Sequence, residues 1–265
     1  GDDVLLYDGT AIVDGLAGDD VLYIPANTSI HYARIKNIET IDLTKNGDHE
    51  MITLTAGAVL NMTDNRNALE IKVDTGDRVN LDLPNWTQQD PAIAVYTDSG
   101  ATVTIVGTGA TIDGQIEGLY YESAFGKSGY TDENGGFEYI VGDTVTFKLG
   151  NVELGSIETN EMTDGKVFLQ DLAGVDRTDV NDEYVENMAV LLQSLDSDSG
   201  DNIVITEEMH DAFSEEDFDL ATISEEDLVS VIEETGRVAV SEDDAMEHVQ
   251  DMLVEYGGIN EDDFD

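Results

Sequence analysis

The 265-residue sequence contains no cysteine and very few basic residues. Without Cys, disulfide bonds and zinc sites built on thiolates are excluded. Only 11 Lys and Arg stand against 59 Asp and Glu, which gives a formal net charge of −48 at pH 7. Such a surface repels nucleic acid and anionic lipid, so we expect neither as a partner. No apolar run reaches the roughly 18 residues that a membrane-spanning helix needs, so we expect no membrane insertion.

The acidic residues are concentrated in the second half of the chain. Residues 1–109 contain 17 acids and 6 bases, whereas residues 110–265 contain 42 acids and 5 bases. Two explanations compete for this excess. Acidic surfaces hold hydration in salty surroundings, as in halophilic proteins, and gathered carboxylates bind divalent ions. Because disulfides are absent, calcium is the stiffening agent that we favour.

A calcium-binding pattern occupies residues 15–23, Gly-Leu-Ala-Gly-Asp-Asp-Val-Leu-Tyr. It follows the nonapeptide G-G-x-G-x-D-x-U-x, with Leu16 in place of the second glycine. In this pattern small residues such as Gly18 let backbone carbonyls and an Asp carboxylate, here Asp20, converge on one ion. The apolar residue that follows, Leu22, is expected to point into the interior of a coil.

A second, truncated copy of this pattern opens the chain at residues 1–7 and places Asp3 opposite Asp20. The glycines that align in the two copies, Gly1 and Gly18, lie 17 residues apart, one fewer than a regular roll of nine-residue half-coils requires. The alternative for both copies is an ordinary Gly-Asp turn that holds no ion.

These residues carry a family resemblance. Residues 7–20, together with the run Asn-Ile-Glu-Thr-Ile-Asp-Leu-Thr at 37–44, resemble segments of giant RTX adhesins that bacteria export by type I secretion. The resemblance covers residues 1–109, and residues 110–205 separately resemble a module of large bacterial surface proteins. It implies an extracellular, calcium-binding segment at the bacterial cell surface. Since the sequence begins within a repeat, without Met or a signal peptide, we expect it to be part of a longer protein.

The first part of the chain predicts a β-solenoid or β-roll over residues 1–109. Short runs that alternate apolar and polar residues recur between turn signals, as half-buried strands do. An antiparallel β-sandwich is the alternative. The expected strands are residues 38–43, 52–55, 69–73, 79–83, 93–96 and 102–106.

Residues 110–160 predict a small β-domain. A hairpin is expected to turn at Asn134 and Gly135, and another to join residues 145–149 and 152–155. The phrase Thr-Asp-x-Asn-Gly-x-Phe at 131–137 is similar to hairpins of transthyretin-like and Cna-B-like domains of surface proteins.

Residues 161–265 predict an acidic helical part. Apolar residues of the segment 181–195 share one helical face. Three later helices are expected to begin at Ser214, Ser224 and Ser241, each followed by acids that suit a helix N-terminus. These acidic clusters resemble metal-binding sites, but helix N-capping explains them better.

An EF-hand-like loop follows residue 195. Asp196 and Asp198 occupy loop positions 1 and 3, and Glu207 occupies the position of the closing bidentate ligand. The match is partial, because Gly200 stands where a ligand is expected and Asp201 where the turn glycine should be. An acidic linker without metal is the alternative.

Aromatic residues provide the weaker candidates for ligand binding. Trp86, the only tryptophan, lies near Pro84 in a loop-like stretch and can stack on a sugar, although a plug at the end of a core is the commoner role. Tyr120 and Tyr121 offer further stacking surfaces.

The sequence as a whole favours a calcium-stabilised extracellular adhesin segment that contributes to cell adhesion and biofilm. A calcium-dependent module that binds glycan or peptide, and a passive structural spacer, are the alternatives. We expect no enzyme, because no HExxH zinc motif or G-x-S-x-G elbow occurs and carboxylate pairs are too abundant to be diagnostic. A calcium-dependent polysaccharide-active enzyme would need basic residues near an acidic substrate, and these are scarce.

Overall fold

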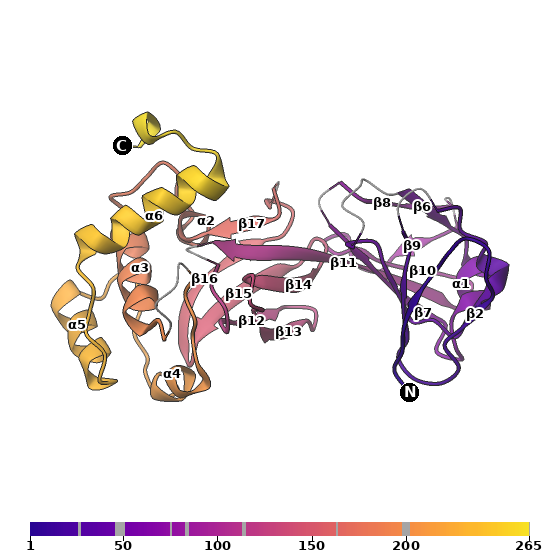
Figure 1. Cartoon of the computed structure of the whole chain (residues 1–265), viewed down its shortest axis with the longest axis horizontal. Helices are drawn as coiled ribbons and strands as arrows, with labels where there is room; N and C mark the ends of the chain where they lie inside the picture. Colours follow the sequence, from indigo (N-terminus) through magenta and orange to yellow (C-terminus); the bar gives the residue numbers. More distant parts are fainter. Residues whose placement is uncertain are drawn as a thin grey trace. The chain divides into compact units, whose positions relative to one another are not determined.

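The computed structural model describes residues 1–25, 28–45, 51–74, 76–82, 85–112, 115–162, 164–197 and 202–264. These residues form a mixed α/β fold with several sheets and six α-helices (Figure 1). The chain divides into two compact units, and each is described by itself. The first unit comprises residues 1–108 and 138–143, and the second comprises residues 109–137 and 144–265. The expected further boundary at residue 160 stays a prediction.

The first unit is built mainly of short strands. Each of the six strand runs expected from the sequence overlaps an observed strand. The elements of this unit, with two strands that continue into the second, are β1 (Val4–Leu6), β2 (Val13–Asp14), β3 (Val21–Tyr23), η1 (Tyr32–Arg34), β4 (Ile35–Lys36), β5 (Thr40–Asp42), β6 (Met51–Leu54), α1 (Ala56–Met62), β7 (Ala68–Val73), β8 (Arg78–Leu81), β9 (Thr87–Gln88), β10 (Val95–Asp98), β11 (Ala101–Ile112) and β14 (Gly136–Ile140).

A parallel ladder runs through this unit in the order β1, β3, β5, β7 and β11. The register places Leu22 beside Ile41, and Ile41 beside Ile71. All three side chains are fully buried, which confirms that Leu22 points inward. Because these strands pair in parallel, the antiparallel sandwich is wrong for them.

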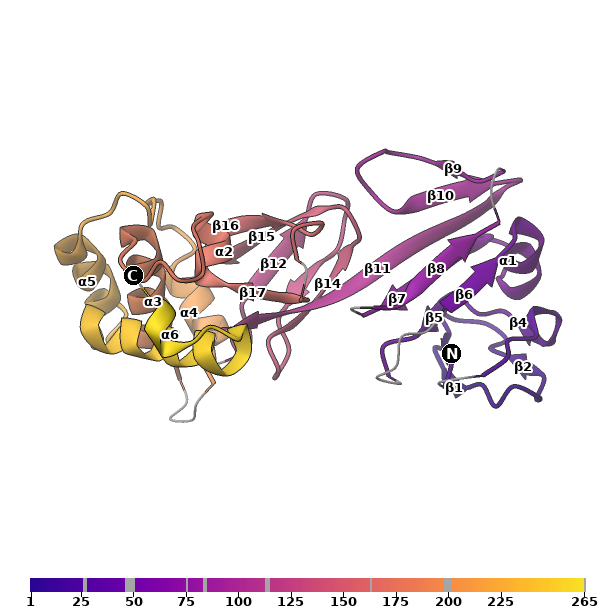
Figure 2. The same cartoon turned by 90° about the horizontal axis from the view of Figure 1, so that it is seen from above.

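The first unit also contains two smaller parallel pairs, β2 with β4 and β6 with β8. The sequence reading missed α1, which Thr55 caps by accepting a hydrogen bond from the Ala58 amide. Its residues Val59 and Met62 are fully buried against the same core as the ladder. Antiparallel pairing also occurs in this unit, where β10 pairs with the first residues of β11 and β9 pairs with β10 (Figure 2).

The second unit combines a four-stranded antiparallel sheet with five α-helices among its described residues. Its strands follow the order β13, β12, β15 and β16. The elements are β12 (Tyr120–Ser123), β13 (Ser128–Tyr130), β15 (Thr144–Leu149), β16 (Val152–Glu158), β17 (Lys166–Phe168), α2 (Leu169–Ala173), α3 (Glu183–Leu195), α4 (Glu207–Ala212), α5 (Glu225–Glu234), α6 (Glu242–Gly257) and η2 (Glu261–Asp263).

One of the two expected hairpins forms and the other does not. Strands β15 and β16 pair as expected. The turn at Asn134 and Gly135 also forms, since Asp132 Oδ1 accepts hydrogen bonds from the amides of Asn134 and Gly136, each at 2.8 Å. However, β13 pairs with β12 and β14 pairs with β11, so the strands that flank the turn belong to different sheets. The residues of the turn fix the bend, but they do not determine which strands β13 and β14 pair with.

The helices agree with the sequence at three of four positions. Helix α3 buries Met188, Leu191 and Leu195 as expected, and α3 packs between α5 and α6 (Figure 1). Ser224 and Ser241 cap α5 and α6 through the amides three residues later. The helix expected after Ser214 is absent, because the Ser214 hydroxyl donates to the Asp211 carbonyl and closes α4 instead.

Within the described parts of the chain, no helix has both the length and the apolar character needed to cross a membrane.

Candidate metal centre

A column of carboxylates lies at the start of the parallel ladder. The register pairs Val4 with Val21 and Val21 with Thr40, so the residues just before them, Asp3, Asp20 and Glu39, stack on one another. The carboxylates of Asp20 and Glu39 each accept a hydrogen bond from the amide of the residue stacked before them. The Asp3 amide donates to Asp20 Oδ1 at 2.8 Å, and the Asp20 amide donates to Glu39 Oε2 at 3.1 Å. These bonds join the segments that lead into β1, β3 and β5.

Asp20 keeps one oxygen that nothing described satisfies. Its side chain is fully buried, and among the described residues Oδ2 has no hydrogen-bond partner. A buried ionised carboxylate with one unsatisfied oxygen is costly, so a cation is its natural complement. The unsatisfied Oδ2 atom of Asp20 is the feature that most favours a bound metal ion.

A second oxygen points to the same place as Asp20 Oδ2. If Gly15 carried a Cβ, that atom would lie 2.5 Å from Asp20 Oδ2 and 2.3 Å from the Asn37 carbonyl oxygen. A carboxylate and a carbonyl oxygen therefore converge beside a glycine that leaves the space open. Calcium prefers such hard oxygen ligands, typically about 6–8 of them.

The backbone around this space is tightly turned. Leu16, where the pattern has glycine, adopts φ = +70°, Gly18 adopts +147° and Asn37 adopts +50°. Asp14 Oδ1 holds the turn by accepting from the Leu16 amide at 3.0 Å and from Asn37 Nδ2 at 2.6 Å. The backbone thus takes the left-handed conformation that the pattern requires even though Leu16 is the less suitable residue.

Glu39, which sequence reasoning did not single out, is the third carboxylate of the column. It is 9% exposed, and Oε1 has no hydrogen-bond partner among the described residues. Burial raises the pKa of Glu39 above its usual value, against the opposing hydrogen bond from the Asp20 amide. The run 37–44 carried the signal, because aligning it with 18–25 places Glu39 opposite Asp20.

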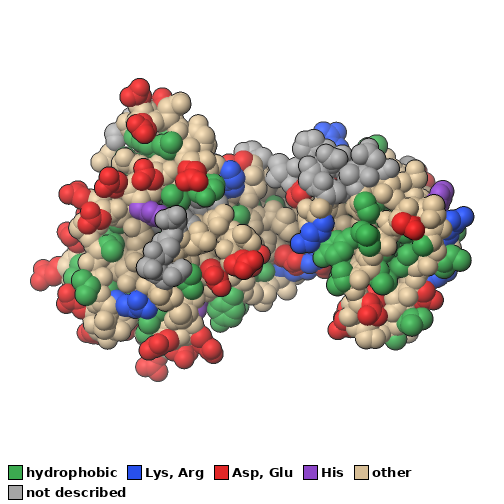
Figure 3. All heavy atoms as spheres, in the orientation of Figure 1, with side chains coloured by type: hydrophobic (Ala, Val, Ile, Leu, Met, Phe, Trp, Pro, Cys, Tyr) green, Lys and Arg blue, Asp and Glu red, His purple; other side chains and the backbone are tan. Residues whose placement is uncertain are grey.

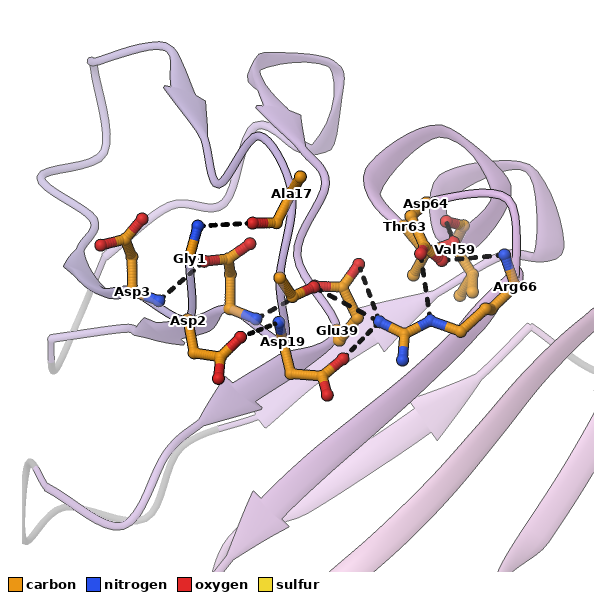
Figure 4. Close-up of polar contacts among 12 residues, drawn as sticks. Gly1, Asp2, Asp3, Ala17, Asp19, Glu39, Val59, Thr63, Asp64 and Arg66 are labelled. Atoms are coloured by element: carbon orange, nitrogen blue, oxygen red, sulfur yellow. Dashed lines mark hydrogen bonds and ion pairs between the residues drawn. The ribbon is translucent and has the colours of Figure 1, made fainter.

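Arg66 supplies positive charge next to Glu39 (Figure 4). Its Nη2 lies 2.5 Å from Asp19 Oδ1 and 3.8 Å from Glu39 Oε1, and its Nε lies 3.0 Å from Asp64 Oδ2. The hydrogen bond to Asp19 is the largest of the effects that raise the pKa of Arg66.

The predicted ligands of the first site are thus partly brought together. Asp20 lies in the buried column, while Asp3 is exposed and joins it through its amide. The Gly18 carbonyl oxygen accepts from Arg66 Nη2 at 3.4 Å, so it faces a guanidinium. Among the described residues, no three or more His, Cys, Asp or Glu side chains are grouped so that they could hold a metal ion. Asp20 and the Asn37 carbonyl fit part of a calcium shell, which backbone carbonyls and water would have to complete.

The predicted EF-hand-like loop is described only at its ends. Asp198 and Asp201 lie outside the described residues. Asp196 follows α3, and its Oδ1 accepts a hydrogen bond from the Val204 amide at 2.8 Å. Glu207 is the first residue of α4. A parallel bridge between Val204 and Glu117 anchors the end of the loop on the β-domain.

The aromatic candidates differ in exposure. Trp86 is 6% exposed and belongs to the core of the first unit, in keeping with a plug. Tyr121 is also buried, with its ring 5.7 Å from that of Phe137. Tyr120 is half-buried and packs edge-on against Tyr130, whose side chain is 59% exposed. Tyr130, which the sequence reading missed, presents more ring surface than the residues it named.

The chain matches no family model, no curated protein and no solved structure. The likeness to RTX adhesins therefore rests on the residues quoted above.

Proposed function

We propose that this chain is a calcium-stabilised extracellular segment of an RTX-type bacterial adhesin, exported by type I secretion and contributing to adhesion at the cell surface. The buried Asp20 carboxylate, whose Oδ2 has no hydrogen-bond partner among the described residues, is the observation that carries the proposal. Its nearest support is the Asn37 carbonyl oxygen, which points to the same open space beside Gly15.

Asp20 and the Asn37 carbonyl would hold the ion. Bound calcium would supply the positive charge that offsets the buried Asp20 carboxylate. The chain's own part is to hold the two turns in register through the amide-to-carboxylate bonds of the column. Because cytosolic calcium is scarce and extracellular sites are tuned to about 0.1–1 mM, the turns would stay loose until export.

The finer fold is part of the same proposal. We propose that the parallel ladder of the first unit is a short β-roll, since its strands recur in parallel register with a buried apolar column. The β15–β16 hairpin supports a relation of the second unit to transthyretin-like and Cna-B-like domains. The EF-hand-like loop that leads from Asp196 to Glu207 remains a separate proposed calcium site. The expectation that the chain is not an enzyme stays a prediction.

The test compares Asp20→Asn with Asp82→Asn, an exposed acid of the same unit. Asn at position 20 keeps an oxygen for the Asp3 amide but replaces the other carboxylate oxygen with an amide nitrogen. In EDTA, Asp20→Asn should melt no lower than wild type, because it removes a buried charge. In calcium at 100 times its dissociation constant, wild type should gain about 2.7 kcal/mol per site, and the variant should lose one such gain.

Thermal melting and calorimetric titration measure both effects, with Asp82→Asn expected to follow wild type throughout. If wild type melts at the same temperature in calcium and in EDTA, or if Asp20→Asn keeps the full calcium response, the proposal fails.

One observation favours the glycan-binding alternative as a second candidate. The exposed ring of Tyr130 beside Tyr120 forms an aromatic edge on strands β12 and β13. Sugars stack on aromatic faces of this kind. A glycan array probed in calcium and in EDTA distinguishes this function from a passive spacer, which would bind nothing.

A further inference from the structure

Three oxygens of the first unit surround a single nitrogen of Arg66. Nη2 lies 2.5 Å from Asp19 Oδ1, 3.4 Å from the Gly18 carbonyl oxygen and 3.8 Å from Glu39 Oε1. Two carboxylates and a backbone carbonyl are the ligand types that hard cations bind in proteins. The guanidinium therefore stands at the centre of a cation-binding set of oxygens (Figure 4).

Glu39 shows that this set is more than a solvated acidic surface. Its side chain is 10% exposed, and Oε1 is buried without a hydrogen-bond partner among the described residues. The 3.8 Å separation from Nη2 is an ion pair but is longer than a charge-assisted hydrogen bond, which measures about 2.7–2.9 Å. A small cation, able to approach oxygens at about 2.3–2.6 Å, would satisfy this carboxylate better than the guanidinium does.

Space is available where the guanidinium now lies. A cavity of about 350 Å³ opens here, lined among others by Asp19, Glu39, Arg66, Glu70 and Thr104. The Arg66 side chain is 49% exposed, so it can turn toward solvent without disturbing the core. Asp64 holds it from the other side, through Nε at 3.0 Å and the Arg66 amide at 2.8 Å.

We propose that Gly18, Asp19 and Glu39 form a second site for a divalent cation, and that Arg66 fills it as a built-in counterion. The Arg66 guanidinium neutralises Glu39 without a metal, as calcium is proposed to neutralise Asp20. The third carboxylate of the column is thereby neutralised at every calcium concentration. This site goes beyond the proposed function, because it does not require that Asp20 bind an ion.

Arg66→Met tests the site, since it removes the guanidinium but keeps a side chain of similar reach. Isothermal titration with calcium chloride should find one more bound ion in this variant than in wild type. Its melting temperature should fall in EDTA, because Asp19 and Glu39 lose their counterion, and calcium should restore it. Arg78→Met is the matched control: it removes one exposed positive charge from the same unit and should leave the ion count unchanged.

Two further variants make the result specific. Glu39→Gln added to Arg66→Met should abolish the extra ion, because the amide keeps an oxygen for the Asp20 amide but loses the second carboxylate oxygen. Arg66→Gln, which can still donate a hydrogen bond to Asp19, serves if the methionine variant does not fold. It should also gain one ion. An unchanged ion count in a folded Arg66 variant would overturn the proposal.

The outcome is separable from that of the proposed function. Wild type that binds no calcium, with an Arg66→Met variant that binds one ion, would refute the Asp20 site and support this one. An extra ion that persists in Asp20→Asn combined with Arg66→Met assigns it to Glu39 and Asp19. Loss of the extra ion in that double variant would overturn the second site.

Discussion

At the scale of single residues, Arg177 joins two carboxylates in the second unit. Its Nη1 donates to Asp164 Oδ2 at 2.7 Å, and its Nη2 donates to Asp171 Oδ2 at 2.8 Å. The guanidinium also lies 4.4 Å from the centroid of the Phe168 ring. Burial alone would raise the pKa of Asp164, but the hydrogen bonds from Arg177 and the Lys166 amide hold it below its usual value of 3.8. The ionised form of Asp164 is therefore favoured by folding.

We expect Arg177→Met to lower the free energy of unfolding at neutral pH by about 1–3 kcal/mol, between the values for exposed and buried ion pairs. Because the pKa of Asp164 is lowered in the folded state, its contribution is present above pH 3.8 and is lost as the pH falls through the folded pKa. The difference between variant and wild type should therefore shrink in acid. Urea denaturation at neutral and acidic pH measures it.

Lys148→Met is the control for this prediction. It removes the same charge from the same unit, but Lys148 forms an ion pair with Glu122, which is 44% exposed. Its cost should stay below about 1 kcal/mol. Equal losses from the two variants would show that net charge, rather than the paired geometry, accounts for the effect.

At the scale of elements, His210 attaches the six-residue helix α4 to two loops. Nδ1 accepts a hydrogen bond from the Gly150 amide at 3.0 Å, so Nε2 carries the proton and donates to the Gly118 carbonyl at 2.8 Å. Both glycines have positive φ. A Cβ on Gly118 would collide with the backbone of Ile205, and a Cβ on Gly150 would collide with the backbone of His210 and Phe213. The close approach of these loops is what places the His210 ring between them.

Replacing His210 with Ala should destabilise the second unit by about 1–3 kcal/mol, because it leaves the partly buried Gly150 amide and Gly118 carbonyl without these partners. His210→Asn should cost less, since its oxygen can still accept from Gly150. Asp211→Ala, at an exposed position of the same helix, is the control. Urea denaturation followed by circular dichroism measures the losses. An alanine variant as stable as the control would mean that packing, and not these bonds, holds α4.

At the scale of the whole molecule, charge is distributed unequally between the two units. The first contains 19 acids and 6 bases, and the second contains 40 acids and 5 bases. Figure 3 shows acidic side chains over the helices of the second unit. Repulsion among like charges opposes the compact state, so this unit has more to gain from screening.

We therefore expect sodium chloride in the presence of EDTA to raise the melting temperature. Raising the salt from about 0.1 to 1 M shortens the Debye length from about 10 to 3 Å, which screens exposed carboxylates but hardly affects buried Asp20. Scanning calorimetry should place most of the gain in the second unit. Calcium chloride at matched ionic strength should add a further rise that Asp20→Asn reduces. A melting temperature that does not respond to salt would exclude charge repulsion as a main destabilising effect.

Local patterns predicted many elements of this chain. Alternating residues located six strands of the first unit, and the Ser224 and Ser241 phrases located α5 and α6. They failed for one strand pairing and for one helix start. The turn at Gly135 formed but its strands joined different sheets, and Ser214 closed one helix instead of opening another.

The sequence by itself determined the strand and helix periodicity, the acidic surface and the turn that holds Asp20, because these depend on neighbours a few residues apart. Only the tertiary structure decided that Glu39 stacks on Asp20, that Arg66 reaches Asp19 from 47 residues away, and that Tyr121 is buried while Tyr130 is exposed. The physical reason is register. Parallel pairing of β1, β3 and β5 brings distant carboxylates into one column, and no local pattern specifies where a strand will find its neighbour.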